Sequence, residues 1–250
     1  MKSTILSYIM EDNISIVLLR TPWIVLAIVL GVVACIALYK GDYRTYFKSS
    51  LFVKTVMWLP LYVGFCLASY SASLASIVAL VIVVGALYEW SKRGKAFVFG
   101  YLIFFLIGCI VWPLSLHYLG NTVWIAIVLA SVVSDVAAFF LGKSLGRHHL
   151  PKYLNSRKSY EGVVGQLVGG VVGIMITGIL FGIETAWWWG ISIGVLSTVG
   201  DLANSFTKRK LLIDDWGNTI PGHGGVMDRF SSLNAVLIGA TVLSLVLLYS

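Results

Sequence analysis

Residues 205–231 gather side chains that could handle phosphate groups, inside a chain that is otherwise strongly apolar. Guanidinium and ammonium groups donate charged hydrogen bonds to phosphate oxygens, and carboxylates are hard oxygen ligands for a divalent cation. The basic side chains of the segment are Lys208, Arg209, Lys210 and Arg229. The acids within it or just before it are Asp201, Asp214, Asp215 and Asp228. These residue types indicate phosphoryl or nucleotidyl transfer, which needs bound phosphates held in line and their charge neutralised.

Two of the acids are the best candidates for a metal site. Mg²⁺ is usually held by one or two carboxylates and keeps waters and substrate phosphates as its other ligands, which suits Asp201 and Asp228. On a helix, Asp201, Ser205 and Lys208 share one stripe, because the second residue follows the first by four positions and the third by three more. That stripe is typical of a wall for a metal-bound phosphate. The alternative is a buried Asp–Lys pair that only fixes helix packing.

The glycine-rich stretch 221–225 would let backbone approach a ligand closely, because Gly222, Gly224 and Gly225 carry no Cβ. His223 within it could act as a general acid or a phosphate donor, or could only brace the loop. Arg229 could grip a phosphate through two parallel hydrogen bonds. The sequence contains no Walker-type loop, Rossmann fingerprint or Gly-x-Ser-x-Gly elbow, which disfavours the other common phosphate and hydrolase chemistries.

The elements that must position these residues are membrane helices. The chain is 58% hydrophobic and only 12% charged, and its mean hydropathy is +0.90. A spanning helix needs about 20 mostly apolar residues. We expect an all-α, polytopic integral membrane protein with about eight spans. The expected spans are 22–39, 52–69, 72–90, 96–116, 122–141, 162–183, 186–206 and 232–249.

The first 21 residues are ambiguous, because acids interrupt an apolar pattern there. They predict an interfacial helix, with a ninth span as the alternative, and we expect no cleaved signal peptide. The whole chain, 1–250, is expected to be one membrane domain, in which residues 22–120 form N-terminal helices and residues 121–250 form catalytic helices and cytoplasmic loops.

Positive charge is confined to alternate loops. All of the 18 basic residues except Lys2 and Arg20 lie in or at the edge of the first, third, fifth and seventh connections between spans. By the positive-inside rule these loops face the cytoplasm and both termini lie outside. The net charge of +7 is therefore explained by topology, and we expect no nucleic-acid partner.

Three acids lie within spans or at their ends, where a carboxylate is costly and normally faces a partner, a metal or water. They are Glu89, Asp135 and Asp201. Glu89 precedes Lys92 and Arg93, so an interfacial ion pair is the alternative to a functional role. A face of glycines in the sixth expected span, 162–183, suits close helix packing and would also allow a homodimer.

Residues 205–231 resemble the signature of the phosphatidate cytidylyltransferases, also called CDP-diacylglycerol synthases. The matching positions are Ser205, Lys208, Arg209, Asp215, Pro221, Gly222, His223, Gly224, Gly225, Asp228 and Arg229, preceded by Gly200 and Asp201. Fainter similarity upstream involves Tyr88, Glu89, Asp135, Ala138, Phe139, Gly142, Gly146 and the stretch Lys158–Gly162. The resemblance covers roughly residues 75–235 and is strong only in the last third.

The resemblance implies a multi-pass enzyme of the cell inner (cytoplasmic) membrane that condenses CTP with phosphatidate and releases pyrophosphate. It implies Mg²⁺ held by Asp201 and Asp228, with a second cation left open, and the bilayer and a lipid phosphate as partners. The residues that it implies in catalysis are Asp201, Asp228, Lys208, Arg209, Arg229 and His223. Those that it implies in substrate binding are Ser205, Asp215, Gly222, Gly224, Gly225, Lys158 and Asp135.

The chain departs from the family pattern at two positions. Asp214 stands where the signature has lysine, and Ser231 stands where it has aspartate. Lys210 could replace the missing cation. Two alternatives therefore remain open: a divergent relative that uses another lipid phosphate or nucleotide, and a catalytically weak membrane binding or assembly protein or, in the same class, an ion pathway lined by Asp135 and Asp201.

Overall fold

The computed structural model describes residues 50–154 and 158–249, and this part of the chain is built from helices. The helices are α4 (Ser50–Tyr70), α5 (Ala72–Arg93), the short 3₁₀ helix η1 (Ala96–Val98), α6 (Phe99–Leu119), α7 (Asn121–Leu145), α8 (Tyr160–Phe181), α9 (Trp187–Leu211) and α10 (Val226–Tyr249). Each expected span from 52–69 onward coincides with one of them, so the all-α expectation is confirmed for the described residues. The expected first span, 22–39, and the segment 1–21 lie outside those residues.

Five of the described helices are long and apolar enough to cross a membrane: Ala72–Arg93, Ala96–Leu119, Asn121–Leu145, Tyr160–Phe181 and Val226–Val246. Helix α4 contributes a shorter apolar stretch, Pro60–Tyr70. Helix α9 is not among the five; it begins with three tryptophans, contains several polar residues and Asp201, and ends in the basic run Lys208–Lys210. The chain is thus a multi-pass membrane protein, while the total of eight or nine spans stays a prediction.

Serine caps stand at the start of two helices, and a glycine stands at the end of one. Ser71 accepts a hydrogen bond from the Leu74 amide at 3.2 Å at the start of α5, and Ser159 accepts one from the Gly162 amide at 3.2 Å at the start of α8. Such caps satisfy amides that have no partner within their own helix. Gly182 ends α8 in the left-handed conformation, with φ at 65°. Short connections therefore join antiparallel neighbours.

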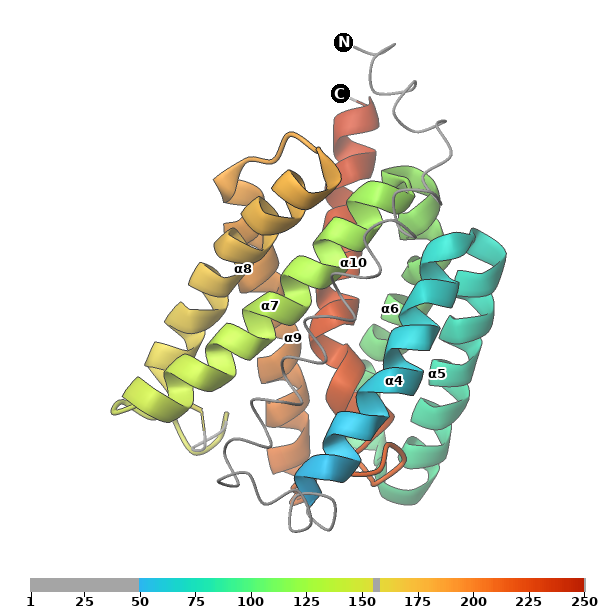
Figure 1. Ribbon diagram of the computed structural model, residues 1–250. Coiled ribbons are helices and arrows are strands. Elements are labelled where there is room, and N and C mark those ends of the chain that lie inside the picture. Colours follow the sequence, from blue (N-terminus) through green and yellow to red (C-terminus); the bar gives the residue numbers. More distant parts are fainter. Residues whose placement is uncertain (1–49, 155–157, 250) are drawn as a thin grey trace.

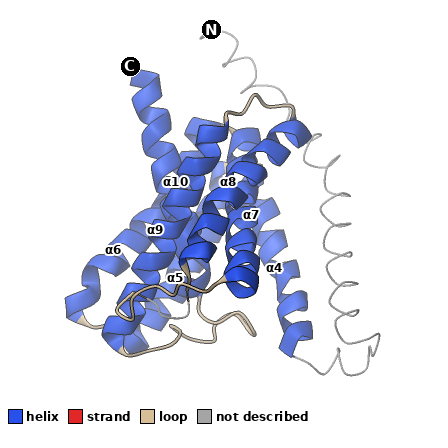
Figure 2. Ribbon diagram, turned by 90° about the vertical axis from the view of Figure 1, so that its left-hand side faces the viewer, coloured by secondary structure: helices blue, strands red, loops and turns tan. Residues whose placement is uncertain are grey.

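The helices form a bundle in which the connections alternate between its two ends (Figure 1, Figure 2). In Figure 1, the α5–α6, α7–α8 and α9–α10 connections lie at the lower end, and the C-terminus lies at the upper end. The lower connections carry the clustered basic residues of the sequence. The described bundle thus gathers these charged loops at one end, as the topology prediction requires.

Glycines in α8 let this helix approach both of its neighbours. A Cβ on Gly169 would lie 2.9 Å from the Ser134 Cα in α7, and a Cβ on Gly170 would lie 2.3 Å from the Gly190 carbonyl oxygen in α9. Only glycine permits backbones this close. The glycine face of α8 is therefore used inside the chain and gives no support for a homodimer.

A buried amide fixes α10 against α6. Asn234 is fully buried; its Oδ1 accepts a hydrogen bond from Trp112 Nε1 at 2.9 Å and its Nδ2 donates to the Phe105 carbonyl at 3.1 Å. Gly108 makes room for it, because a Cβ there would lie 2.4 Å from the Asn234 Cβ. This contact sets the register of α10 beside α6 and brings the start of α10 to the charged end of the bundle.

Candidate functional site

The glycine-rich loop between α9 and α10 is a tight turn. The Ile220 amide donates to the Gly224 carbonyl at 2.9 Å, and the His223 amide donates to the Ile220 carbonyl at 2.9 Å. Gly222 and Gly224 have φ values of 74° and 87°, a conformation that other residues rarely adopt. The turn delivers the chain directly into α10 at Val226. Gly222 and Gly224 of the signature are thus required by the backbone of the turn.

Trp216, in the first half of the α9–α10 loop, contacts three helices. Its ring stacks between those of Trp90 in α5, at 5.9 Å between centroids, and Tyr101 in α6, at 5.8 Å. Its Nε1 donates to Asn204 Oδ1 in α9 at 2.8 Å. Trp216 is only 1% exposed. A buried aromatic residue with its N–H satisfied is a strong anchor, so the loop is fixed on α5, α6 and α9.

Asp228 lies at the centre of the charged end. It belongs to the first turn of α10, and its Oδ1 is 2.6 Å from Lys208 Nζ. Its Oδ2 accepts hydrogen bonds from the amides of Trp216, at 2.9 Å, and Gly225, at 3.0 Å. The side chains of Asp228 and Lys208 are 5% and 11% exposed. Asp228 therefore joins α9, the loop and α10 at one buried ion pair.

Asp201 pairs with a lysine from another segment, whereas the alternative drawn from its helical stripe was a pair with Lys208. Its Oδ2 is 2.7 Å from Nζ of Lys158, which precedes α8, while Lys208 is engaged with Asp228. The spacing within α9 could not reveal this, because Lys158 comes from a distant part of the sequence. Both candidate metal ligands are thus neutralised by an ammonium group.

The remaining charges of the loop lie nearer to solvent. Lys208 Nζ is also 3.4 Å from Oδ1 of the exposed Asp215, and Arg209 Nη1 is 3.2 Å from Asp214 Oδ1. Lys210 lies over the ring of Phe206, 4.5 Å from its centroid, and its replacement of the lysine that the signature has at position 214 stays a prediction. Asp214 therefore neutralises one of the cations expected to hold phosphate.

Arg229, His223 and Ser205 complete the signature. Arg229 is exposed, and its Nε donates to the His223 carbonyl oxygen at 2.5 Å, which braces the turn. The side chains of His223 and Ser205 are buried, at 7% and 4% exposure. The described contacts of His223 are those of a bracing residue, while its role in catalysis stays a prediction.

Glu89 in α5 caps helix α10, a role that the sequence did not reveal. Its Oε1 accepts hydrogen bonds from the Val226 amide at 2.6 Å and from Thr219 Oγ1 at 2.5 Å, and its Oε2 accepts one from the Met227 amide at 3.0 Å. Glu89 is 1% exposed. A Cβ on Gly225 would lie 2.7 Å from Oε2, so this glycine makes room for the carboxylate. The helix start favours a negative charge, and Glu89 supplies it.

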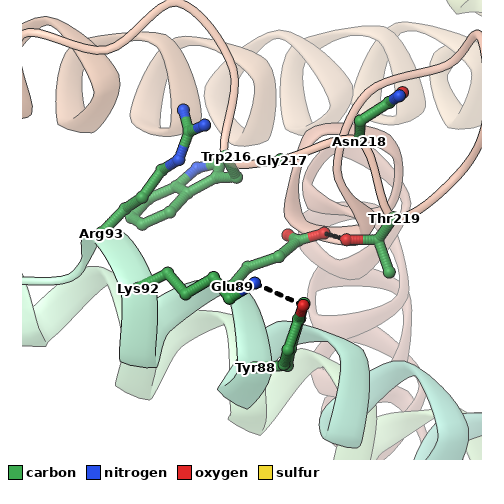
Figure 3. Close-up of a pocket in the computed structure, with 8 residues that line it drawn as sticks. All are labelled: Tyr88, Glu89, Lys92, Arg93, Trp216, Gly217, Asn218 and Thr219. Carbon is green, nitrogen blue, oxygen red and sulfur yellow. Dashed lines mark hydrogen bonds between the residues drawn. The ribbon is translucent and has the colours of Figure 1, made fainter.

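The alternative interpretation of Glu89 was an ion pair with Lys92 or Arg93, but in the structure all three side chains have other partners. Figure 3 shows the Glu89 carboxylate directed toward Thr219. The Lys92 ammonium donates to the Tyr88 hydroxyl, and Arg93 Nη1 donates to the Asp215 carbonyl oxygen at 2.6 Å. The partners of Glu89 lie at the start of α10, so they can be recognised only once the packing of α5 against α10 is known.

These residues border a pocket of about 440 Å³ on the α5 side of the loop (Figure 3). Its lining is formed by Tyr88, Glu89, Lys92, Arg93, Trp216, Gly217, Asn218 and Thr219. Two cations stand at this pocket, and Arg93 links it to the backbone of Asp215. The pocket is therefore a recess formed jointly by the end of α5 and the signature loop.

Asp135 joins four helices deeper in the bundle. Its Oδ1 accepts hydrogen bonds from Gln166 Nε2 in α8 at 2.9 Å and from Ser197 Oγ in α9 at 2.7 Å. Its Oδ2 accepts one from Ser232 Oγ in α10 at 2.9 Å. Such a network satisfies a half-buried carboxylate. The structure thus gives Asp135 a packing role, and its expected role in substrate binding stays a prediction.

A hydrated divalent cation fits this donor set better than a closed protein cage. No cluster of three or more His, Cys, Asp or Glu side chains placed to hold a metal occurs within residues 50–154 and 158–249. Asp201 and Asp228 each hold a cationic ammonium at 2.7 Å and 2.6 Å. Carboxylates that already attract positive charge suit an ion that takes its remaining ligands from water and substrate phosphates.

Comparison with known proteins agrees with the signature. Residues 2–247 match the model of the cytidylyltransferase family. The phosphatidate cytidylyltransferase of Mycobacterium leprae is 37% identical over 123 residues, which are 48% of this chain and 39% of that protein. That of Mycobacterium tuberculosis strain H37Rv is 35% identical over 124 residues, 48% of this chain and 38% of the relative.

A third relative matches over a longer range. The phosphatidate cytidylyltransferase of Rickettsia bellii is 29% identical over 205 residues, which cover 74% of this chain and 87% of that protein. Against the mycobacterial relatives, in contrast, the chain spans less than half of their length.

Proposed function

Because the chain belongs to the cytidylyltransferase family, we propose that it transfers the cytidylyl group of CTP to phosphatidate, giving CDP-diacylglycerol and pyrophosphate. The observation that carries the proposal is the buried Lys208–Asp228 pair at the start of α10. The pair brings an ammonium group and a carboxylate of the signature within 2.6 Å of each other.

In the proposed reaction, a phosphate oxygen of phosphatidate attacks the α-phosphorus of CTP. The new P–O bond forms as the bond from the α-phosphorus to the bridging oxygen breaks, and pyrophosphate leaves with that electron pair. Lys208, Lys158 and Arg209 bind the phosphate oxygens and neutralise their charge. Asp201 and Asp228 would hold Mg²⁺, which would supply additional charge neutralisation at the phosphates.

Side chains, and not the start of α10, bind the phosphates in this proposal. A helix N-terminus commonly binds anions through its free amides. Here the Val226 and Met227 amides are taken by Glu89, and the Gly225 amide is taken by Asp228. Lys208 then has two roles in this proposal: it neutralises Asp228 in the described structure, and it would bind a phosphate oxygen of the substrate.

We further propose that the charged end of the bundle faces the cytoplasm and that the protein lies in the cell inner membrane. The clustered basic loops support this orientation, and CTP is found on that side. The acceptor is a lipid phosphate that reaches the site from the bilayer. A second cation beside Mg²⁺ and a homodimer are further expectations, of which the second has no support in the described contacts.

A second candidate function is nucleotidyl transfer from a nucleotide other than CTP, or to a lipid phosphate other than phosphatidate. The observation that favours it is the contact of Asp214 with Arg209, because it removes positive charge from the expected phosphate site.

The test is a reconstituted reaction with purified protein, Mg²⁺, CTP and phosphatidate. We expect CDP-diacylglycerol and pyrophosphate in equal amounts, and at least a hundredfold slower reaction for Asp228→Asn. The matched control, Glu184→Gln, changes an exposed acid in the α8–α9 connection and should keep full activity. A blank with CTP and phosphatidate, together with pyrophosphate release from another nucleotide or lipid phosphate, would select the second candidate.

A further inference from the structure

Two buried hydroxyls at the charged end have no hydrogen-bond partner among the described residues. They are Tyr101 Oη in α6 and Ser231 Oγ in α10. Tyr101 is 8% exposed and Ser231 is fully buried. A buried polar group without a partner costs about 1–3 kcal/mol. Groups of this kind in native proteins call for a cause, such as a ligand or water that binds them.

Packing alone does not explain the Tyr101 hydroxyl. The ring of Tyr101 stacks almost parallel on Trp216, with 10° between the two planes. Phenylalanine would make the same ring contact without burying a hydroxyl. The oxygen of Tyr101 is therefore dispensable for the anchoring of the loop.

The two hydroxyls lie beside the proposed metal ligands. Ser231 follows Asp228 by three residues in α10, hence on the same side of the helix. The Ser231 carbonyl oxygen would be 2.4 Å from a Cβ on Gly200, the residue before Asp201. The hydroxyl of Tyr101 lies near that of Ser231, without good hydrogen-bond geometry, and within the electrostatic reach of Asp228 and Asp201.

Water is the ligand that fits this set of groups. Carboxylates only accept hydrogen bonds, whereas each hydroxyl donates one and accepts others. A buried water needs two to four polar partners, and Mg²⁺ normally keeps several of its waters. Two hydroxyls next to two carboxylates supply such partners.

We propose that Tyr101 and Ser231 are positioning residues that hold, through bound water, the hydrated divalent cation of the Asp201–Asp228 site. This inference rests on the proposed function for the presence of that cation. It adds a residue of α6, outside the signature, to the site. Groups that hold the ligands of a metal in place typically contribute a factor of about 10–100 to metal affinity.

The experiment measures Mn²⁺ binding to the purified full chain in detergent by electron paramagnetic resonance, without CTP or lipid. The variants are Tyr101→Phe, Ser231→Ala and the pair together. Thr122→Val is the matched control, since Thr122 Oγ1 is another buried hydroxyl without a partner in the described part, at the opposite end of the bundle. Thermal unfolding without a divalent cation is measured for each.

We expect Mn²⁺ affinity to fall about 10–100-fold in the double variant and to stay within twofold of wild type in Thr122→Val. The unfolding midpoint without cation should be unchanged or higher in all variants, because each loses an unsatisfied buried hydroxyl. Double-variant affinity within twofold of wild type would overturn the inference, as would wild-type protein that binds no Mn²⁺. Neither readout uses CTP or lipid, so failure of the proposed reaction would be seen separately.

Discussion

Replacing Glu89 by glutamine tests whether a buried carboxylate of α5 holds the start of α10. Glutamine has the same shape as glutamate, but one of its two acceptor oxygens becomes an NH₂ donor. Glu89 Oε1 has two donors and Oε2 has one. The least costly orientation therefore keeps the amide oxygen at the Oε1 position and turns the NH₂ group toward the Met227 amide.

The magnitude follows from that orientation. One hydrogen bond to a charged group is lost, which costs about 1.5–3 kcal/mol, and the Met227 amide is left buried without an acceptor. Loss of the negative charge at the helix start adds to this cost. We expect Glu89→Gln to lower the free energy of unfolding by about 2–4 kcal/mol. Activity should fall as well, because Asp228 lies in the same first turn of α10.

The assay is the thermal unfolding midpoint in one detergent, combined with the rate of lipid product formation. Glu184→Gln is the matched control, since it makes the same chemical change at an exposed position in the α8–α9 connection. We expect a midpoint several degrees lower for Glu89→Gln and an unchanged midpoint for the control. Equal midpoints for Glu89→Gln and wild type would refute the capping role of Glu89.

Three further changes test separate contacts. Asp214→Asn should lower the KM for CTP about two- to fivefold in steady-state kinetics. The reason is that it frees Arg209 from a surface ion pair worth up to about 1 kcal/mol. An unchanged KM would contradict the proposed contact of Arg209 with CTP. Lys208→Met should lower the unfolding midpoint and abolish activity. It leaves the buried carboxylate of Asp228 without its ammonium partner, at a cost of about 3–5 kcal/mol. A fully active variant would disprove the proposed role of Lys208. Gly170→Ala should destabilise the protein in thermal unfolding, whereas Gly64→Ala, with no atom within 4 Å of its new Cβ, should not; equal midpoints would refute the tight α8–α9 contact.

Hydropathy predicted the helices well because a membrane-spanning helix needs a long, continuous apolar stretch. Such a stretch can be recognised from the sequence without knowledge of how the helices pack. The expected span 122–141 falls within α7, Asn121–Leu145, and 162–183 overlaps α8, Tyr160–Phe181. Helix ends differ by a few residues, because polar residues of the last turn still belong to the helix.

Partners from distant segments could not be predicted in the same way. The spacing within α9 predicted one stripe for Asp201 and Lys208, with a pair between them only as the alternative to a phosphate wall. In the structure Asp201 binds Lys158 and Lys208 binds Asp228. Glu89 likewise has its partner 137 residues away along the chain. Helical periodicity shows which residues share a face, whereas the neighbour of that face depends on how the bundle is assembled.

The most direct measurement of the central claim follows the phosphorus atoms of CTP into products. Purified protein in phosphatidate-containing vesicles is given Mg²⁺ and CTP labelled with ³²P at either the α- or the γ-phosphate. The α-label should appear in lipid extracted with organic solvent and the γ-label in pyrophosphate, and both should be lost in Asp228→Asn. Transfer of the γ-label to lipid, or no transfer of the α-label by wild-type protein, would contradict cytidylyl transfer at this site.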